Sequence, residues 1–340
     1  MARPSSESET WKSLVLRSMP APAWLSADAP QSDVVLSSRC RVMRNLTGFR
    51  FPHHAKNEEL KAVQSQVLRA CSPLQPGVED LGKLTQAERD YLVGCRLVSP
   101  DFEWRATGRS VLLDQNRILS LMVNEEDHVR LQALTAGYSF EHAESVANQT
   151  LRVVGEGLDF AWSPRFGFLA ASPYNAGEGR RLSTMLHLIG LGHTQRLPSM
   201  IKAAGAHRVI VRGLFGESSR AIGAFVQVSV TGGTRAEFVG ACDYLIKAER
   251  AARLEVERSV VEDRAKRAIE FVIASPALTL AHALRVLGWM RWAACQEIAG
   301  IPFNHRDVDG WLTALEIRNT HDEDKASRQR ADYLRARLDP

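Results

Sequence analysis

The chain has 340 residues, of which 45% are hydrophobic and 24% charged, an ordinary globular composition that excludes a disordered or fibrous protein. A net charge of +4 is too small to indicate a nucleic-acid-binding surface, and no apolar run reaches the ~20 residues of a membrane span. Five cysteines stand singly, without a CxxC pair, so we expect neither disulfides nor structural zinc. The N-terminus lacks the basic-then-apolar order of a signal peptide. We therefore expect a cytoplasmic protein of about two domains, at the usual ~150 residues for each.

Apolar spacing predicts helices and strands that alternate along the first two thirds of the chain. Residues 1–31 form an arm rich in serine, alanine and proline. Helices are expected at residues 58–70, 141–154, 180–191 and 199–205, and another begins at Thr85 with a capping-box Glu88. Strands are expected at residues 110–113, 118–123, 166–171, 209–211 and 224–230. Because these strands arrive in hairpins beside helices, the expected fold class is α+β with an antiparallel β-sheet.

The last third of the chain reads as helical. Helical patterns cover residues 236–274, 278–299, 311–318 and 325–338, with a break at Ser275-Pro276. We place a domain boundary near residues 253–262. The predicted organisation is an N-terminal arm at 1–31, a catalytic sheet domain at 32–255 and a helical C-terminal domain at 256–340.

Two segments gather charged residues into candidate binding sites. Arg39 and Arg41 follow an extended run and are two residues apart, so both point to one side of a strand. Two guanidinium groups on one side suit a polyphosphate, and a solvated strand edge is the alternative. The segment from Asn124 to Arg130 puts three consecutive carboxylates after an apolar strand. It is either a solvated turn or a carboxylate site for a cationic substrate, with Arg130 available for an anion.

Two further segments combine glycines with charge. Gly177 and Gly179 precede the helix expected at 180–191, and such a loop can cradle phosphate with backbone N–H groups. No Gly-Lys-Ser/Thr follows, so it is not a Walker A loop, and a simple turn is the alternative. The segment from Arg212 to Glu217 leaves a β-branched strand with an arginine and ends with a glutamate, bounded by two glycines.

Together these four segments resemble the ATP:guanido phosphotransferases, the family of arginine and creatine kinases. Residues Asn124 to Arg130 match the family signature Asn-Glu-Glu-Asp-His-x-Arg letter for letter, and Arg212-Gly-x-x-Gly-Glu217 and the paired arginines match as well. The similarity runs from about residue 32 to residue 240. Within the family the chain is most similar to the bacterial protein-arginine kinases, because Phe49-Arg50-Phe51-Pro52 follows the paired arginines as it does there. The helical domain that precedes these arginines in metazoan members is not seen, which leaves room for a large substrate.

The resemblance implies a set of site residues. Glu126, Glu217 and Ser172 would be catalytic, with the two glutamates holding the acceptor guanidinium and Glu126 the favoured base. The implied ATP-binding residues are Ser38, Arg39, Cys40, Arg41, Arg130, Arg181, Leu182, Ser183, Thr184, Met185, Arg212, Gly213, Leu214, Phe215, Gly216 and Glu217. Five of them, Arg39, Arg41, Arg130, Arg181 and Arg212, would bind the ATP phosphates. His128 is expected to be a hydrogen-bonded scaffold residue.

The resemblance also implies ATP and Mg²⁺ as cofactors, and no metal ligands from the protein. The expected function is transfer of the γ-phosphate of ATP to arginine side chains of proteins, marking them for Clp-type proteolysis or regulation. Expected partners are protein substrates with exposed arginines, a Clp protease or activator, and a second copy in a homodimer. Two alternatives remain, a kinase of free arginine and a catalytically impaired phosphoarginine-binding or regulatory homologue.

Three positions depart from the family pattern. Ser172 stands where the family has a cysteine, read as a thiolate near the guanidinium. Glu178 replaces a usual threonine, and Asp101 aligns with a frequent histidine. These departures support the impaired alternative, whereas the five arginines and two glutamates support a working kinase.

Overall fold

The computed structural model describes residues 22–26, 28–74, 77–79, 84–102, 107–205, 209–213, 221–230, 234–315 and 322–338. Within these ranges the side chains of residues 26, 77–79 and 87 are left undescribed. None of the described helices is long and apolar enough to cross a membrane.

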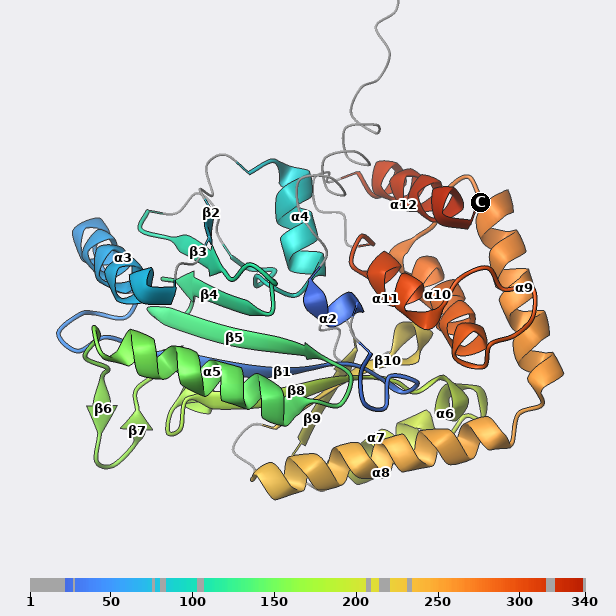
Figure 1. The fold of residues 1–340 in the computed structure, drawn as a ribbon, viewed down its shortest axis with the longest axis horizontal. Helices are drawn as coiled ribbons and strands as arrows, with labels where there is room; N and C mark the ends of the chain where they lie inside the picture. The colour runs from blue at the N-terminus through green and yellow to red at the C-terminus, as the bar shows by residue number, and fades with distance from the viewer. Residues whose placement is uncertain are drawn as a thin grey trace, which may run out of the picture.

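An eight-stranded sheet forms the centre of the molecule (Figure 1). The strand order is β2-β3-β4-β5-β1-β8-β10-β9, and every pairing is antiparallel, which confirms the predicted fold class. The strands are β1 (Val35–Arg44), β2 (Gly77–Glu79), β3 (Ser110–Leu113), β4 (Leu119–Val123), β5 (Val129–Ala136), β8 (Arg180–His187), β9 (Val209–Gly213) and β10 (Phe225–Val230). A small hairpin of β6 (Trp162–Ser163) and β7 (Gly167–Phe168) projects beside the sheet (Figure 1).

Each face of the sheet has its own hydrophobic core. One core holds residues such as Cys40, Leu182 and Val226 together with helices α3 (Asn57–Cys71), α5 (Phe140–Gly155) and α8 (Arg235–Leu254). The other core holds alternate sheet residues, Met185 and Phe225 among them, packed with α4 (Gln86–Gly94) and the C-terminal helices. Because successive residues of a strand point to opposite faces, the apolar residues of β8 and β10 are divided between these two cores.

The remaining helices complete the two layers. Short helices are α2 (Ala23–Ser26), α6 (Ile189–His193) and α7 (Leu197–Gly205), and the C-terminal helices are α9 (Arg258–Ala274), α10 (Leu280–Cys295), α11 (His305–Leu312) and α12 (Glu323–Leu338). Figure 1 shows α10, α11 and α12 gathered at one end of the sheet, with α9 along their outer side. The predicted hairpin of β3 and β4 is confirmed, as is the capping box of Thr85 and Glu88 on α4.

Three predicted helices need correction. Residues 180–191 form strand β8, paired on both sides, followed by the short α6, so the glycine loop enters a strand and not a helix N-terminus. Both faces of β8 are covered by other parts of the protein. A strand buried on both faces lacks the alternation of apolar and polar residues, so its sequence resembles that of a buried helix. The pattern at 236–274 divides into α8 and α9 around residues 255–257, within the predicted boundary region. The helix expected at 311–318 overlaps only the end of α11, which begins earlier because Asn304 caps its N-terminus, and residues 316–318 lie outside the described residues.

The division into an arm, a catalytic domain and a C-terminal domain stays a prediction. The second core cluster contains residues of both predicted domains, including Met122 of β4 and Leu287 of α10. The C-terminal helices are therefore packed directly on the sheet. Their contact with it forms one wall of the cavity described next.

Candidate active site

A cavity of about 320 Å³ lies over one face of the sheet. Its floor comes from strands β1, β5, β9 and β10, and its walls come from α2, the end of α4 with the following loop, and α11. The lining residues are Trp24, Arg39, Arg41, Val93, Gly94, Arg96, Val98, Ser99, Pro100, Asp101, Glu125, Glu126, Arg130, Gln132, Arg212, Gln227, Asp309, Leu312 and Thr313.

Four of the five predicted phosphate-binding arginines line this cavity. Arg39 and Arg41 come from β1, Arg130 from neighbouring β5 and Arg212 from β9. The fifth, Arg181, pairs with Arg41 across β1 and β8. The antiparallel register thus brings together arginines that are up to 173 residues apart in the chain.

Hydroxyl and amide groups hold two of these guanidinium groups. Arg39 donates from Nε to Ser183 Oγ at 3.3 Å and from Nη2 to Gln227 Oε1 at 2.9 Å. Arg181 donates from Nη2 to Ser229 Oγ at 2.9 Å. Neutral acceptors fix the direction of the guanidinium groups and leave their positive charge uncompensated.

The arginines repel one another because burial removes the screening by water. Burial and the charges of Arg130, Arg96 and Arg181 lower the pKa of Arg39 to about 9. The pKa of Arg41 is also lowered, first by burial and then by Arg39. Within the described residues, no carboxylate forms an ion pair with either side chain. A cluster of this kind is matched to an anion with several charges.

Residues 124–128 form the loop between β4 and β5 that carries the three carboxylates, and hydrogen bonds hold this loop at both of its ends. Asn124 adopts φ +54° and donates from Nδ2 to the carbonyls of Leu60 at 2.9 Å and Gly108 at 2.7 Å. His128 Nδ1 accepts a hydrogen bond from the Leu46 amide at 3.0 Å, which confirms the scaffold role predicted for this histidine. These contacts fix the loop against three separate segments, α3, the segment before β3 and the segment after β1.

The three carboxylates of the loop have different surroundings. Glu125 forms an ion pair with Arg130 at 2.7 Å. Asp127 Oδ1 accepts from Asn45 Nδ2 at 2.6 Å and from the Ala171 amide at 2.7 Å, so it ties the loop to the segment that carries Ser172. Only Glu125 and Glu126 reach the cavity, and Glu126 has no arginine partner within the described residues.

The environment of Glu126 favours proton uptake. Partial burial, followed by the charges of Asp127 and Glu125, raises the pKa of the Glu126 carboxyl. Its Oε2 lies 3.4 Å from Asn175 Nδ2, on the loop that also carries Ser172. A carboxylate with a raised pKa, facing a cavity beside a cationic cluster, can orient a cationic acceptor and take a proton from it.

Several predicted site residues lie elsewhere. The side chains of Ser38, Cys40, Leu182 and Thr184 are buried on the opposite face of the sheet, and Ser38 Oγ lies 3.4 Å from Thr184 Oγ1. Met185 is buried in the core on the cavity side, and Ser183 contacts Arg39. Ser172 is half-buried but does not line the cavity. Residues 214–217, including Glu217, lie outside the described residues.

Sequence reasoning missed several residues that line the cavity. Trp24, Arg96, Gln132, Gln227 and Asp309 belong to no predicted motif. Alternation along β5 and β10 could have pointed to the two glutamines, because Gln132 and Gln227 share a face with Arg130 and Arg39. Asp309 had no local signal, because it lies in a region predicted to form another domain. Of the three departures, Asp101 lines the cavity and Glu178 is exposed.

Comparison with known sequences gives consistent matches. The family model described as "ATP:guanido phosphotransferase, C-terminal catalytic domain" matches residues 61–233. The chain is 35% identical over 297 residues to the protein-arginine kinase of Pelotomaculum thermopropionicum, covering 82% of this chain and 83% of that protein. It is 34% identical over 277 residues to the protein-arginine kinase of Halothermothrix orenii, covering 78% and 79% respectively.

Solved structures share the fold at lower identity. A lombricine kinase superposes with a TM-score of 0.57 and 20% identity, covering 70% of this chain and 73% of that one. The duplicated taurocyamine kinase from Schistosoma mansoni, bound to transition-state analogue components, gives a TM-score of 0.59 and 21% identity. That match covers 68% of this chain and 36% of the kinase.

Proposed function

Because the chain belongs to the ATP:guanido phosphotransferase family, we propose that it transfers the γ-phosphate of ATP to arginine side chains of proteins. The family membership makes it an ATP-dependent guanidino-group phosphotransferase. The relatives named protein-arginine kinase support a protein acceptor, because they match most of the length of both chains. The observation that carries the proposal is that Glu126 and the cluster of arginines line one and the same cavity.

In this proposal the arginines bind ATP. Arg39, Arg41, Arg130, Arg181 and Arg212 hold the phosphate oxygens and neutralise the charge that spreads over them during transfer. Phosphoryl transfer depends on positioning and charge stabilisation more than on covalent chemistry. The mutual repulsion of these side chains is relieved when a polyphosphate binds among them.

Glu126 acts on the acceptor. An arginine guanidinium has a pKa above ~12, so a carboxylate cannot remove its proton in advance. Glu126 instead orients one guanidinium nitrogen toward the γ-phosphorus. As the N–P bond forms and the bond from phosphorus to the ADP oxygen breaks, the proton leaves nitrogen for Glu126. The raised pKa of this carboxyl suits the role.

The cavity fits Mg²⁺ that arrives with the nucleotide. Four carboxylates line it, and two of them, Glu125 and Asp309, already accept hydrogen bonds from arginines. The described residues contain no group of three or more His, Cys, Asp or Glu side chains arranged to hold a metal ion. The few carboxylates of the cavity therefore suit a Mg²⁺ ion that is held mainly by the phosphate oxygens of the nucleotide, as is usual in kinases. Such an ion would neutralise phosphate charge.

Other parts of the proposal rest on the family resemblance. Glu217 is proposed as a second carboxylate for the acceptor, residues 213–216 as part of the ATP site, and Ser172 as the residue that replaces the family thiol. We also propose a cytoplasmic location, a Clp-type protease or activator as partner, and a homodimer. All five cysteines are free thiols, which fits a reducing compartment.

One experiment separates the acceptors. The purified chain is incubated with Mg-ATP and either free arginine or an unfolded protein that contains arginine, and acid-labile phosphate is measured on each. The same unfolded protein with every arginine replaced by lysine is the control. We expect phosphate on the arginine-containing protein and little on free arginine. Transfer to free arginine alone would indicate a phosphagen kinase, and no transfer with intact nucleotide binding would indicate a regulatory homologue.

A further inference from the structure

Exposed aromatic side chains gather in one stretch of the chain, around the β6–β7 hairpin. The large apolar side chains that are exposed among the described residues are Trp162, Phe166, Tyr174, Tyr244, Leu254, Phe271 and Ile273. The first three, exposed by 58%, 55% and 79%, are here called the aromatic surface. Aromatic side chains offer a large contact area and are enriched in the centres of protein interfaces, so exposed ones that occur together indicate a surface for another molecule.

The hairpin and the loop that follows it form one unit. In the hairpin Trp162 lies opposite Phe168, and Phe168 in turn exchanges two backbone hydrogen bonds with Gly177, at 2.8 and 3.0 Å. A Cβ atom on Gly167, which has φ +72°, would lie 2.6 Å from the Gly177 carbonyl oxygen, so this close approach requires glycine. These contacts bring the loop that carries Tyr174 back against the hairpin.

The base of this unit is packed on the rest of the molecule. Phe160 packs against the core that holds α3, α5 and α8, and its ring centre lies 6.5 Å from that of Phe168. The guanidinium carbon of Arg44 lies 3.6 Å from the centre of the Phe168 ring, and Arg44 Nη1 donates to the Glu178 carbonyl at 3.0 Å. Figure 1 shows the hairpin at the edge of the molecule, away from the C-terminal helices. The aromatic surface is therefore both exposed and fixed, and a fixed surface loses little freedom when a ligand binds.

The loop of this unit contacts the proposed acceptor site directly. Asn175 Nδ2 donates to Glu126 Oε2 at 3.4 Å, and the Ala171 amide donates to Asp127 Oδ1 at 2.7 Å. Tyr174 is next to Asn175 in the chain, so their Cα atoms are ~3.8 Å apart. The aromatic surface is thus continuous with the group that holds the acceptor carboxylate.

We propose that the aromatic surface binds an unfolded, extended segment of the acceptor protein while an arginine of that segment lies at Glu126. The inference rests on the proposed function, because it takes a protein as the acceptor. Most large apolar side chains are buried in folded proteins, so a segment that offers them beside an arginine is an unfolded one. Each residue of an extended segment advances ~3.3 Å, which places apolar residues two to four positions away at ~7–13 Å from the arginine. The continuity with the acceptor site favours this occupant over a second copy of the chain.

Matched acceptor peptides test the proposal. Both are unstructured glycine–serine peptides with one arginine; one carries phenylalanine three positions before and after the arginine, and the other carries serine there. Transfer from Mg-ATP gives kcat/KM for each peptide. We expect the unchanged chain to prefer the phenylalanine peptide by about tenfold or more, mainly through KM, because apolar surface is buried on binding. This preference should largely disappear in the double variant Trp162→Ser, Phe166→Ser.

Phe271→Ser is the matched control, because it removes an exposed aromatic side chain from α9, outside the aromatic surface. We expect this control to keep the full preference for the phenylalanine peptide. Circular dichroism melts identify a variant that fails to fold, and Phe166→Ser alone, at the turn between β6 and β7, then carries the test. Equal preference in the unchanged chain and in the folded double variant would overturn the proposal, as would no preference in the unchanged chain.

Peptide binding distinguishes failure of this proposal from failure of the proposed function. Fluorescence anisotropy of the two dye-labelled peptides, measured with ADP present, needs no phosphate transfer. We expect the phenylalanine peptide to bind about tenfold or more tightly than the serine peptide, and the double variant to lose this difference. Such a difference without any phosphate transfer would support the aromatic surface and contradict the proposed function. Transfer to both peptides with equal affinities would contradict the aromatic surface alone.

Sedimentation of the same variants tests the other occupant. The double variant should have the same oligomeric state as the unchanged chain if the aromatic surface binds the acceptor. A change from dimer to monomer, with the preference for the phenylalanine peptide retained, would overturn the proposal and assign the surface to an interface between two copies of the chain.

Discussion

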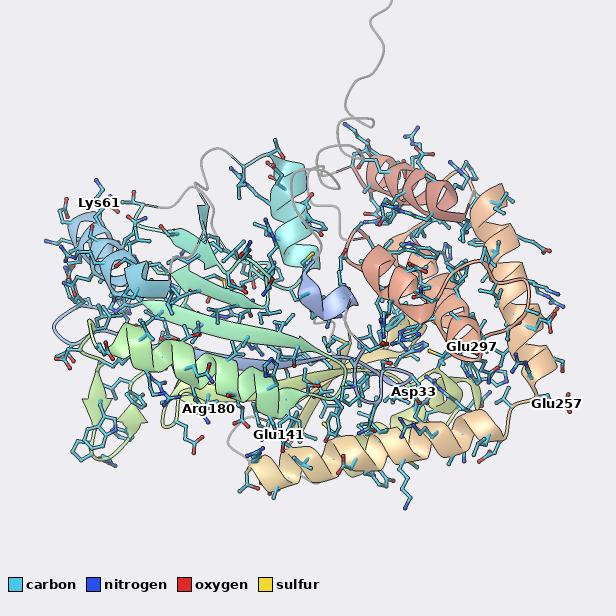
Figure 2. The ribbon with its side chains drawn as sticks, in the orientation of Figure 1. Asp33, Lys61, Glu141, Arg180, Glu257 and Glu297 are labelled. Carbon is cyan, nitrogen blue, oxygen red and sulfur yellow. The ribbon has the colours of Figure 1, made fainter. Side chains whose placement is uncertain are left out.

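Arg180 and Arg181 are neighbours in the chain but lie on opposite faces of the sheet, and their surroundings differ. Arg180, shown beside α5 in Figure 2, forms an ion pair with Glu144 at 3.3 Å and donates to Asn148 Oδ1 at 2.8 Å. On the cavity face, Arg181 donates to the Ser229 hydroxyl, and burial together with Arg212 and Arg130 lowers its pKa. Arg180 is thus matched by a carboxylate on the packed face, whereas Arg181 forms no ion pair with any described carboxylate on the cavity face.

This difference separates stability from function along each strand. The packed face buries apolar side chains against α5 and α8, and Arg180 on this face is paired with Glu144. The cavity face gathers arginines that repel one another until a ligand supplies negative charge. Substitutions on the two faces should therefore change different measurable properties.

The largest effect on stability is expected on the packed face. Leu182 is buried in the core beside Arg181, and Leu182→Ala removes apolar contacts and leaves a cavity. We expect a loss of about 2–5 kcal/mol in the free energy of unfolding, measured by urea denaturation. The KM for ATP of the folded fraction should stay unchanged. A stable variant with weakened ATP binding would contradict the division of the strand between the two faces.

Arg41→Gln should have the opposite effect to Leu182→Ala, a more stable chain with slower phosphoryl transfer. Removing a charge from the cavity face relieves repulsion, so thermal unfolding without nucleotide should occur at a higher temperature, corresponding to about 0.5–2 kcal/mol. Phosphoryl transfer should fall by about 10²-fold or more, because a donor to the developing charge is lost. A lower unfolding temperature would show that Arg41 contributes to stability and is not held against repulsion.

Arg212→Lys should have a smaller effect. Lysine keeps one positive charge but cannot bind two phosphate oxygens with a planar fork. We expect transfer to fall roughly tenfold or more with an unchanged melting temperature, as for one lost charged hydrogen bond. A steady-state rate equal to that of the unchanged chain would remove Arg212 from the phosphate-binding set.

Ser172→Cys is expected to have the smallest effect, a gain of a few-fold in rate. A thiol is nearly the size of the hydroxyl but adds a negative charge above its pKa, which would favour the acceptor orientation near Glu126. The gain should therefore grow between pH 6 and pH 9, measured as transfer to an arginine-containing protein. Identical pH profiles for the two forms would show that the family thiol is dispensable in this chain.

The sequence predicted the parts of the molecule whose signals are local. The β3–β4 hairpin has a turn sequence between two apolar runs, and the Thr85–Glu88 box marks a helix start by itself. The signature from Asn124 to Arg130 predicted a carboxylate and an arginine at one site, and Glu126 and Arg130 both line the cavity. The spacing of Arg39 and Arg41 predicted their common face, and both side chains line the same cavity. Each of these inferences needs only residues that are close together in the chain.

The parts that were missed depend on contacts distant in sequence. The sequence predicts a helix where strand β8 lies, because burial on both faces hides the alternation of a strand. Ser38 and Cys40, which flank Arg39 and are also predicted to bind ATP, have side chains that point to the opposite core. Asp309 reaches the cavity only because the C-terminal helices pack on the sheet, which no pattern around residue 309 indicates.

The central claim is that Glu126 and the arginine cluster act together in phosphoryl transfer, and Glu126→Gln tests it most directly. Transfer from Mg-ATP to an unfolded arginine-containing protein is followed across pH, with Glu178→Gln as a control at an exposed carboxylate. We expect Glu126→Gln to lose about 10²-fold or more in rate, with ADP affinity little changed. The unchanged chain should lose activity as pH falls through the raised pKa of Glu126, because the protonated carboxyl cannot accept a proton. A Glu126→Gln chain that transfers phosphate at the rate and pH profile of the unchanged chain would contradict the account.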